Sequence, residues 1–149
     1  MPQANTVKPA PRLILQSQLG ELARLWPWVE ALADEYAIPA DTLYAIHLCL
    51  EEAISNIVRH GYCGQPDHSI CVHCGLDGVR TLVFTVEDQA PPFDPLAPSA
   101  AAEAPAPTSI DELQPGGQGI RLLRKFAGTL AYQRLAGGNR LTIGIVLPC

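Results

Sequence analysis

The sequence predicts an α+β domain in which an antiparallel or mixed sheet is covered on one face by three helices. Two observations predict this class. Apolar residues recur at spacings of three and four in some segments and alternate in others, and glycine-containing turns join the alternating segments in pairs. The segments follow one another as β-α-α-β-β-loop-α-β-β, so hairpins and helices are segregated along the chain.

Length and composition limit the classes of protein to consider. A chain of 149 residues is long enough for one domain with a sizeable core, and its net charge of −5 argues against nucleic acid or an anionic membrane as the main partner. No stretch approaches the roughly 20 apolar residues of a membrane helix, and the N-terminus lacks the apolar core of a signal peptide. We therefore expect a cytoplasmic protein, with its five scattered cysteines as free thiols.

The first third of the chain predicts a tail, a strand and an interrupted helix. Residues 1–11 contain three prolines and no periodicity, which indicates a flexible tail ahead of one domain at 12–149. Residues 12–18 are typical of a short strand. Residues 19–36 have helical spacing, but Pro27 would lie in the helix interior and should kink the helix or begin a second segment.

The central helix is predicted at residues 41–62, from the first-turn carboxylate of Asp41 to Gly61 near the C-terminal end. One apolar stripe should face the core, and it consists of Leu43, Ile46, Leu50, Ala53 and Ile57. Glu52 and Asn56 lie one turn apart and almost opposite that stripe. A second contact face is predicted upstream of them, at Ala45, Leu48 and Cys49. Such a wall suits a pocket that holds a polar group at one end.

Two hairpins complete the predicted sheet. Segments 69–76 and 79–88 are joined at Asp77-Gly78, and segments 130–135 and 141–147 are joined by a turn at 137–139. Asp88 shares the apolar face of its strand, where a carboxylate must find a hydrogen-bond donor or lose its charge. The donor is either the backbone N–H groups of the next turn or the amino group of a ligand such as adenine.

Residues 89–115 break the composition of the chain. They hold seven of its fourteen prolines and no Lys or Arg, which is typical of a functional lid or a disordered linker. Gly116-Gly117-Gln118-Gly119 then opens a helical pattern. Such a turn has the form of a phosphate cradle, because it presents backbone N–H groups at a helix N-terminus, and a flexible hinge is the alternative.

Glu52 and Asn56 allow chemistry as well as solvation. An Asn side-chain oxygen is a suitable ligand for Mg²⁺, and a carboxylate beside it can act as a general base toward a hydroxyl group. The alternative is an ordinary solvated helix face. A zinc site at Cys71, His73 and Cys74 is disfavoured, because residues three apart on a strand face opposite sides of the sheet.

Three motifs, in this order, resemble those of the GHKL ATPase superfamily, and within it the anti-sigma-factor serine/threonine kinases of the RsbW type. Residues 52–62 (EAISNIVRHGY) are similar to the N box, 88–95 (DQAPPFDP) to the first glycine box, and 116–120 (GGQGI) to the second. The ending at 138–143 (GNRLTI) is also family-like. The resemblance covers about residues 12–147 and implies a Bergerat-type ATP-binding sandwich with a lid at 89–115.

The resemblance also implies roles and partners. It implies Glu52 as catalytic base, Asn56 as Mg²⁺ ligand, and Asp88, with Ala90 and Phe93 of the same motif, as the adenine site. It implies that ATP phosphates are held by Gly116, Gly117, Gln118, Gly119 and Ile120. Positive charge for the triphosphate would come from Arg121 or Arg124 of the following helix. The implied partners are an anti-anti-sigma protein of the STAS type, phosphorylated on serine or threonine, and a sigma factor, and a homodimer is compatible with the pattern.

Two departures favour a rival. The first glycine box usually has Asp-x-Gly, but Ala90 stands at the third position, where a methyl group would lie near the base and resist positive φ. The lid also offers no cation to the phosphates. Both favour a non-catalytic module of the same fold that sequesters a partner, with weak or absent nucleotide binding.

Overall fold

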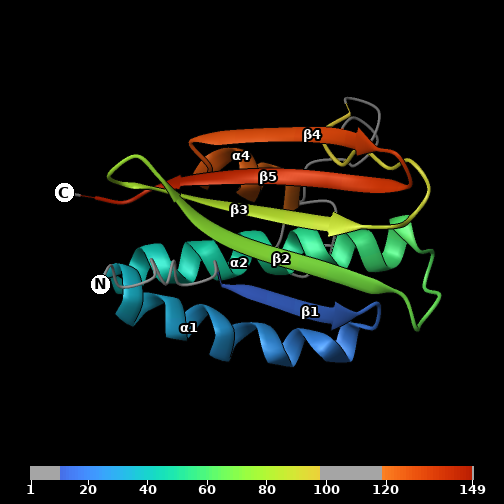
Figure 1. Ribbon diagram of the computed structural model, residues 1–149, viewed down its shortest axis with the longest axis horizontal. Helices are drawn as coiled ribbons and strands as arrows, with labels where there is room; N and C mark the ends of the chain where they lie inside the picture. Colours follow the sequence, from blue (N-terminus) through green and yellow to red (C-terminus); the bar gives the residue numbers. More distant parts are fainter. Residues whose placement is uncertain (1–10, 98–118, 149) are drawn as a thin grey trace, which may run out of the picture.

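Five strands form one antiparallel sheet in the order β1-β2-β3-β5-β4, so the sheet is not mixed. The computed structural model describes residues 11–97 and 119–148. The strands are β1 (Arg12–Gln16), β2 (Ser69–Asp77), β3 (Thr81–Asp88), β4 (Thr129–Leu135) and β5 (Gly138–Val146). Helices α1 (Leu25–Tyr36), α2 (Ala40–Asn56) and α4 (Gly119–Phe126) cover one face of it (Figure 1). The α+β prediction is confirmed. The predicted tail, apart from Pro11, and residues 98–115 of the predicted lid lie outside the described residues.

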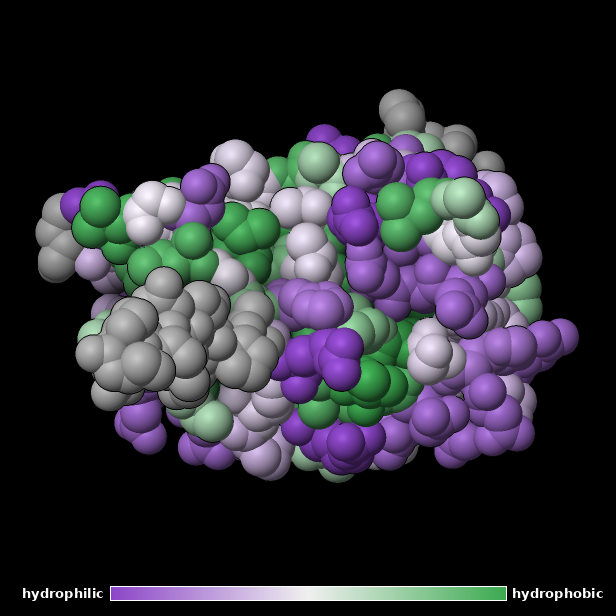
Figure 2. Space-filling view, viewed as in Figure 1, coloured by the Kyte–Doolittle hydropathy of each residue, from purple (hydrophilic) through white to green (hydrophobic). Residues whose placement is uncertain are grey.

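The period of two places the core between the sheet and the helices. The inward side chains of the central strands are almost wholly buried: Ile70, Val72, Cys74, Leu82, Phe84, Val86, Ile143 and Ile145. The opposite face carries no helix among the described residues. Figure 2 looks at that face and shows hydrophilic residues over much of its right-hand half. Polar side chains of its three adjacent strands β3, β5 and β4 include Thr85, Glu87, Gln133, Arg140 and Thr142.

The segment predicted as an interrupted helix at 19–36 contains a 3₁₀ helix, η1 (Leu19–Arg24), followed by α1. Pro27 is the third residue of α1, so it lies in the first turn, where its missing N–H costs no hydrogen bond. The predicted second segment is therefore confirmed. Helix α1 ends at Tyr36, and the C-cap residue Ala37 has a left-handed φ of 53°.

The central helix was predicted as one α-helix to Tyr62, but its last turn is π-helical. α2 ends at Asn56 and continues as a π-helical turn, η2 (Ile57–Gly61), in which the Tyr62 N–H donates to the Ile57 carbonyl at 2.8 Å. The apolar stripe packs in the core as predicted. The second face is also a contact face, because the Cys49 Sγ lies 4.0 Å from the Leu122 carbonyl of α4.

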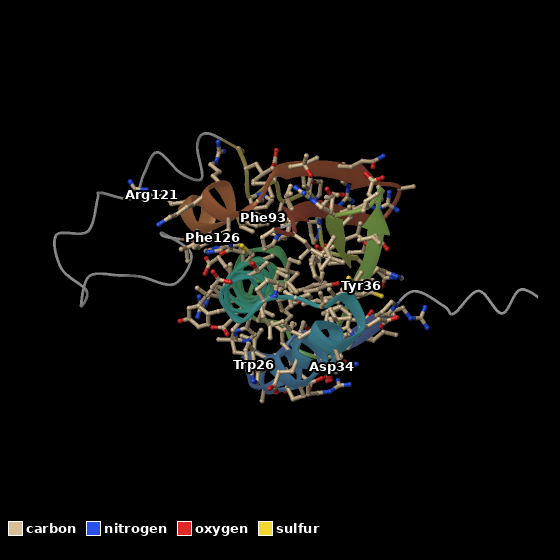
Figure 3. All side chains as sticks on the ribbon, turned by 90° about the vertical axis from the view of Figure 1, so that its left-hand side faces the viewer. Trp26, Asp34, Tyr36, Phe93, Arg121 and Phe126 are labelled. Carbon is tan, nitrogen blue, oxygen red and sulfur yellow. The ribbon has the colours of Figure 1, made fainter. Side chains whose placement is uncertain are left out.

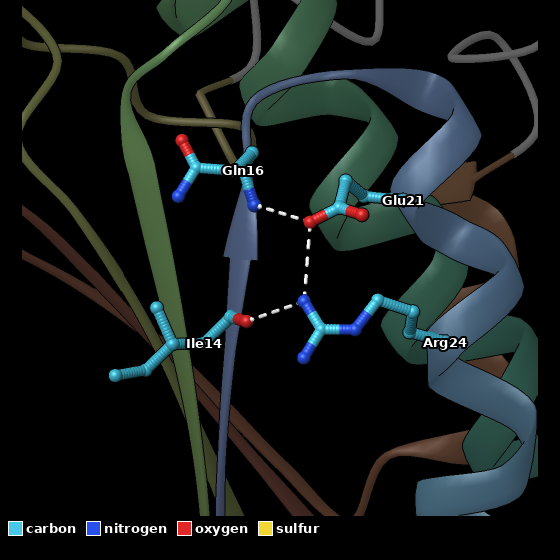
Figure 4. Close-up of polar contacts among 4 residues, drawn as sticks. All are labelled: Ile14, Gln16, Glu21 and Arg24. Atoms are coloured by element: carbon cyan, nitrogen blue, oxygen red, sulfur yellow. Dashed lines mark hydrogen bonds and ion pairs between the residues drawn. The ribbon is translucent and has the colours of Figure 1, made fainter.

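Strand β1 is an edge strand whose outward backbone groups are bonded by side chains of η1. The Gln16 N–H donates to Glu21 Oε1 at 3.0 Å, and Arg24 Nη1 donates to the Ile14 carbonyl at 3.0 Å and to Glu21 Oε1 at 3.1 Å (Figure 4). The hydrogen bond from Gln16 is the main reason that the pKa of Glu21 is lowered. The two side chains therefore cover an edge that another strand could pair with.

The turn was predicted at 137–139, but Gly138 and Asn139 belong to β5 and not to the turn. Leu135 pairs with Gly138, so Ala136 and Gly137 form a two-residue turn and Gly138 begins β5. Only glycine fits at position 138, because an added Cβ would overlap the carbonyl oxygen of Asp88 on the neighbouring strand. This close approach puts Asn139 directly opposite Asp88.

Candidate functional site

The ends of α2 and β3 meet through side chains of the predicted N box and first glycine box. The Gln89 N–H donates to the Tyr62 hydroxyl at 2.8 Å, and that hydroxyl donates to the Ser69 carbonyl at 2.9 Å. The rings of His60 and Phe93 stack with their centroids 5.7 Å apart. The π-helical turn thus presents its last residues to the loop that follows β3. Two motifs that are distant along the chain are thus brought together.

Between them lies a small apolar pocket with one polar end. Its lining comes from α2, η2, β3, β4, β5 and the loop: Ala53, Ile57, Val86, Asp88, Phe93, Pro95, Tyr132, Asn139 and Leu141. The cavity volume is about 10 Å³, enough for about one water molecule. A purine ring needs several times that space, so it enters only if the loop wall at Phe93 and Pro95 moves outward.

Asp88 is the charged group of this pocket. Its carboxylate is 7% exposed, and Oδ1 accepts hydrogen bonds from the Ala90 N–H at 2.9 Å and from Asn139 Nδ2 at 2.8 Å. Burial raises the pKa of Asp88, while these two hydrogen bonds and the charge of Arg134 oppose that rise. The turn-capping alternative is therefore confirmed. Because both bonds from described residues reach Oδ1, Oδ2 keeps its capacity to accept from a ligand.

Asn139 is a site residue that the sequence reasoning missed. It was read as part of a turn, but it lies in β5 and is only 4% exposed. Its amide bonds to Asp88, to two carbonyl groups of the loop and to side chains of β4. The local signals for it were an amide directly after a pair of glycines and its place in the family-like ending at 138–143.

Ala90 does not occupy the place that the sequence suggested. It is 1% exposed, it has no positive φ, and it is absent from the lining of the pocket. A Cβ added at Gly61 would lie 3.3 Å from the Ala90 Cβ, so the methyl group faces the glycine of the π-helical turn. The expectation of backbone strain at Ala90 is wrong, because this turn needs no left-handed residue at position 90.

Glu52 and Asn56 lie beside the pocket. Their successors Ala53 and Ile57 line it, so the two polar residues occupy the adjacent face of the same helix. Asn56 is 3% exposed and Glu52 is half-buried. Their roles as Mg²⁺ ligand and base stay predictions.

The predicted phosphate-binding residues include the start of α4 and the residues that precede it in the sequence. Gly116, Gly117 and Gln118 lie outside the described residues, and Gly119 and Ile120 begin the helix. Arg121 is exposed, and Figure 3 shows it on the outer side of α4, pointing away from Phe93. Arg124 reaches the lid instead, where its Nη2 donates to the Leu96 carbonyl at 3.2 Å.

The cysteines form no group of metal ligands in the described part of the chain. Cys71 Sγ lies 3.2 Å from His73 Nε2, but Cys74 points into the core, and residues 11–97 and 119–148 contain no group of three ligands. Burial raises the pKa of Cys74 to about 12 and that of Cys49 to about 11, as suits free thiols packed in a core. None of the helices in these residues has the length and apolar character needed to span a bilayer.

Known proteins match this chain over most of its length. A model of the histidine kinase-like ATPase domain matches residues 15–145. The serine/threonine-protein kinase BtrW of Bordetella bronchiseptica is 36% identical over 117 residues, which cover 78% of this chain and 79% of that protein. An anti-sigma F factor of Halalkalibacterium halodurans is 30% identical over 112 residues, or 74% and 72% of the two chains.

A solved structure shares the fold. The RsbU and RsbW domains of Rv1364c from Mycobacterium tuberculosis superpose with a TM-score of 0.63 at 17% identity. The match covers 93% of this chain and 33% of that one. At this level of identity the likeness supports the fold alone.

Proposed function

The chain belongs to the histidine kinase-like ATPase domain family, and from this premise we propose that it binds ATP between α2 and the sheet and phosphorylates a protein partner on serine or threonine. One observation carries the proposal. A buried carboxylate, Asp88, closes the end of an apolar pocket whose other wall is the helix that carries Glu52 and Asn56. Apolar walls suit the faces of a purine ring, and an acceptor at one end suits the adenine amino group.

The residues fit the nucleotide at the base end. Ala53 and Ile57 would contact one side of the ring and Val86 and Leu141 the other, while Oδ2 of Asp88 would accept from the exocyclic amino group. The base would displace Phe93 and Pro95 outward, since the cavity is water-sized. These two residues belong to a loop with no regular secondary structure, so their movement would break no strand pairing.

Mg²⁺ and the phosphates would lie beyond the apolar pocket, toward Glu52, Asn56 and the start of α4. The Asn56 side-chain oxygen would hold Mg²⁺, which when bound supplies the charge neutralisation that phosphoryl transfer needs. Glu52, one turn earlier on α2, would accept the proton of the attacking hydroxyl group. The backbone N–H groups at the N-terminus of α4 would face the phosphates, with Gly116, Gly117 and Gln118 forming the approach to them.

The names of the relatives support the class of partner. One is called a serine/threonine-protein kinase and another an anti-sigma F factor. We accordingly propose that the phosphorylated partner is an anti-anti-sigma protein of the STAS type and that a sigma factor is a second partner. The protein would act in the cytoplasm as one domain spanning residues 12–149, as a monomer or as a homodimer.

Two measurements test this function. Titration calorimetry with ATP and Mg²⁺ should show saturable binding, and label from the γ-phosphate should appear on the partner. Glu52→Gln should reduce transfer by about 10²- to 10⁴-fold while binding persists. Glu51→Gln is the matched control, because Glu51 is adjacent, about half exposed and paired only with His47 among the described residues. Undiminished transfer by Glu52→Gln would make the catalytic role wrong.

The rival from another class is a non-catalytic module that sequesters its partner. The absence of Lys and Arg between residues 89 and 115 favours it, since the lid then offers no cation to a triphosphate. Binding of ATP without transfer would leave this rival standing. An absence of heat at millimolar nucleotide would remove the kinase function.

A further inference from the structure

Asn139 bonds to every element that forms the polar end of the pocket. Its Nδ2 donates to Asp88 Oδ1 at 2.8 Å, to the Pro91 carbonyl at 3.1 Å and to the Ala90 carbonyl at 3.3 Å. Its Oδ1 accepts from the Phe93 N–H at 3.3 Å and from the Tyr132 hydroxyl. One side chain thus joins β5 to β3, to β4 and to the loop that walls the pocket.

The chemistry of the amide is needed at this position. Asn139 is 4% exposed, so its partners have no water to replace it. An aspartate could not donate to Asp88 and would place a second buried charge beside it, and a threonine hydroxyl offers a single donor. An amide alone presents two N–H donors and an acceptor oxygen at once, which is the set that the surrounding atoms require.

Two consequences follow for the pocket. The Asn139 amide and the Ala90 N–H together hold Asp88 Oδ1, so the carboxylate is fixed in rotation and Oδ2 is the oxygen that remains for a ligand. The same amide holds the backbone at positions 90, 91 and 93, and Phe93 forms part of the wall that a base must displace. The orientation of the carboxylate and the position of the loop are therefore controlled by one residue.

We propose that Asn139 is a positioning residue for adenine recognition: it orients Asp88 toward the exocyclic amino group and couples that contact to the position of loop residues 90–93. The inference rests on the proposed function, because it assigns a specificity role within the same ATP site. The inference concerns recognition of adenine, so it can be tested separately from phosphoryl transfer.

The test compares ATP with purine riboside triphosphate, which lacks only the amino group, by calorimetry with Mg²⁺. Wild type should prefer ATP by about tenfold or more, because the analogue offers no donor to Asp88 Oδ2. Asn139→Ala should lower this preference to about threefold or less, because one of the two hydrogen bonds that orient the Asp88 carboxylate is lost. Arg140→Gln is the control. Arg140 is the next residue of β5, bonds Glu87 at 2.6 Å on the opposite face, and its variant should keep the wild-type preference.

Tyr132→Phe is a milder second variant, which keeps the test possible if Asn139→Ala fails to fold. It removes one donor to Asn139 Oδ1 and should lower the preference in the same direction by a smaller factor. Hydrogen exchange adds a readout of the loop. The peptide spanning 89–97 should exchange faster in Asn139→Ala, while the peptide spanning β3 should not change.

The outcomes separate the inference from the proposed function. If wild type binds neither nucleotide, the ATP site itself is wrong and the inference is overturned with it. If wild type prefers ATP and both Asn139→Ala and Tyr132→Phe weaken the two nucleotides equally, Asn139 has only a structural role and the inference alone is overturned. Loss of preference with faster exchange of the loop supports it.

Discussion

Replacing Asp88 by asparagine should separate the stability of the fold from recognition of the base. The Oδ1 of asparagine can still accept from the Ala90 N–H and from Asn139 Nδ2. The substitution changes only the second atom, because the acceptor Oδ2 becomes an NH₂ donor. Its effect on a ligand is therefore specific, while the hydrogen bonds inside the protein are retained.

The sign of the stability change follows from the raised pKa of Asp88, whose ordinary value is 3.8. Between 3.8 and the higher pKa of the folded state, the folded protein binds more protons than the unfolded chain, so stability falls as the pH rises through this window. Above this window the cost of the buried charge is fully present. Asp88→Asn removes it and should raise the free energy of unfolding there, a difference that shrinks as the pH falls through the window and disappears below the ordinary pKa of 3.8.

The effect on binding should have the opposite sign. A charge-assisted hydrogen bond is worth about 1.5–3 kcal/mol, so ATP should bind about 10- to 100-fold more weakly to Asp88→Asn. Inosine triphosphate, which has a carbonyl oxygen in place of the amino group, should gain relative to ATP because the new NH₂ can donate to it. Calorimetry with both nucleotides and urea unfolding at pH 4 and pH 7 measure these quantities. Equal weakening of the two nucleotides, or loss of stability at pH 7, would contradict this role of Asp88.

Three further predictions concern the fold around the site. Gly138→Ala should destabilise the protein by about 1–3 kcal/mol in urea unfolding, since its Cβ would overlap a backbone oxygen, whereas Gly75→Ala, with open space, should not. Glu21→Ala should increase self-association in analytical ultracentrifugation, because it uncovers an edge-strand N–H; an unchanged sedimentation coefficient would contradict this. Exposed Cys63 should react with maleimide in the folded protein, but Cys74, with a pKa of about 12, should react only after unfolding.

Local patterns were enough to predict most of the fold. The period of two placed Asp88 on the buried face of its strand, and the structure shows the four inward residues of β3 at 7% exposure or less. The helical stripe of α2 likewise packs in the core. These predictions depend on the chain within one element, where side-chain direction is set by backbone geometry.

Features that depend on pairing between distant segments could not be predicted in this way. Asn139 meets Asp88 because β5 pairs with β3 across 51 positions of the sequence, and no window around either residue contains that information. The π-helical turn is a similar case. Residues 57–61 have helical spacing in the sequence, but the last turn widens where Tyr62 must reach the Gln89 amide.

The position of Ala90 bears on the choice between a kinase and a sequestering module. A methyl group at position 90 would weaken nucleotide binding if it intruded on the base or strained the turn. In the structure the methyl group faces Gly61 outside the pocket, and the Ala90 N–H donates to Asp88. Alanine at this position therefore adds packing at the helix end and does not line the pocket. The rival keeps only the cation-free lid in its favour, and that feature acts on the triphosphate and not on the base. Weak affinity caused by the lid should consequently appear for ATP but not for adenosine, whereas an intruding methyl group would weaken both.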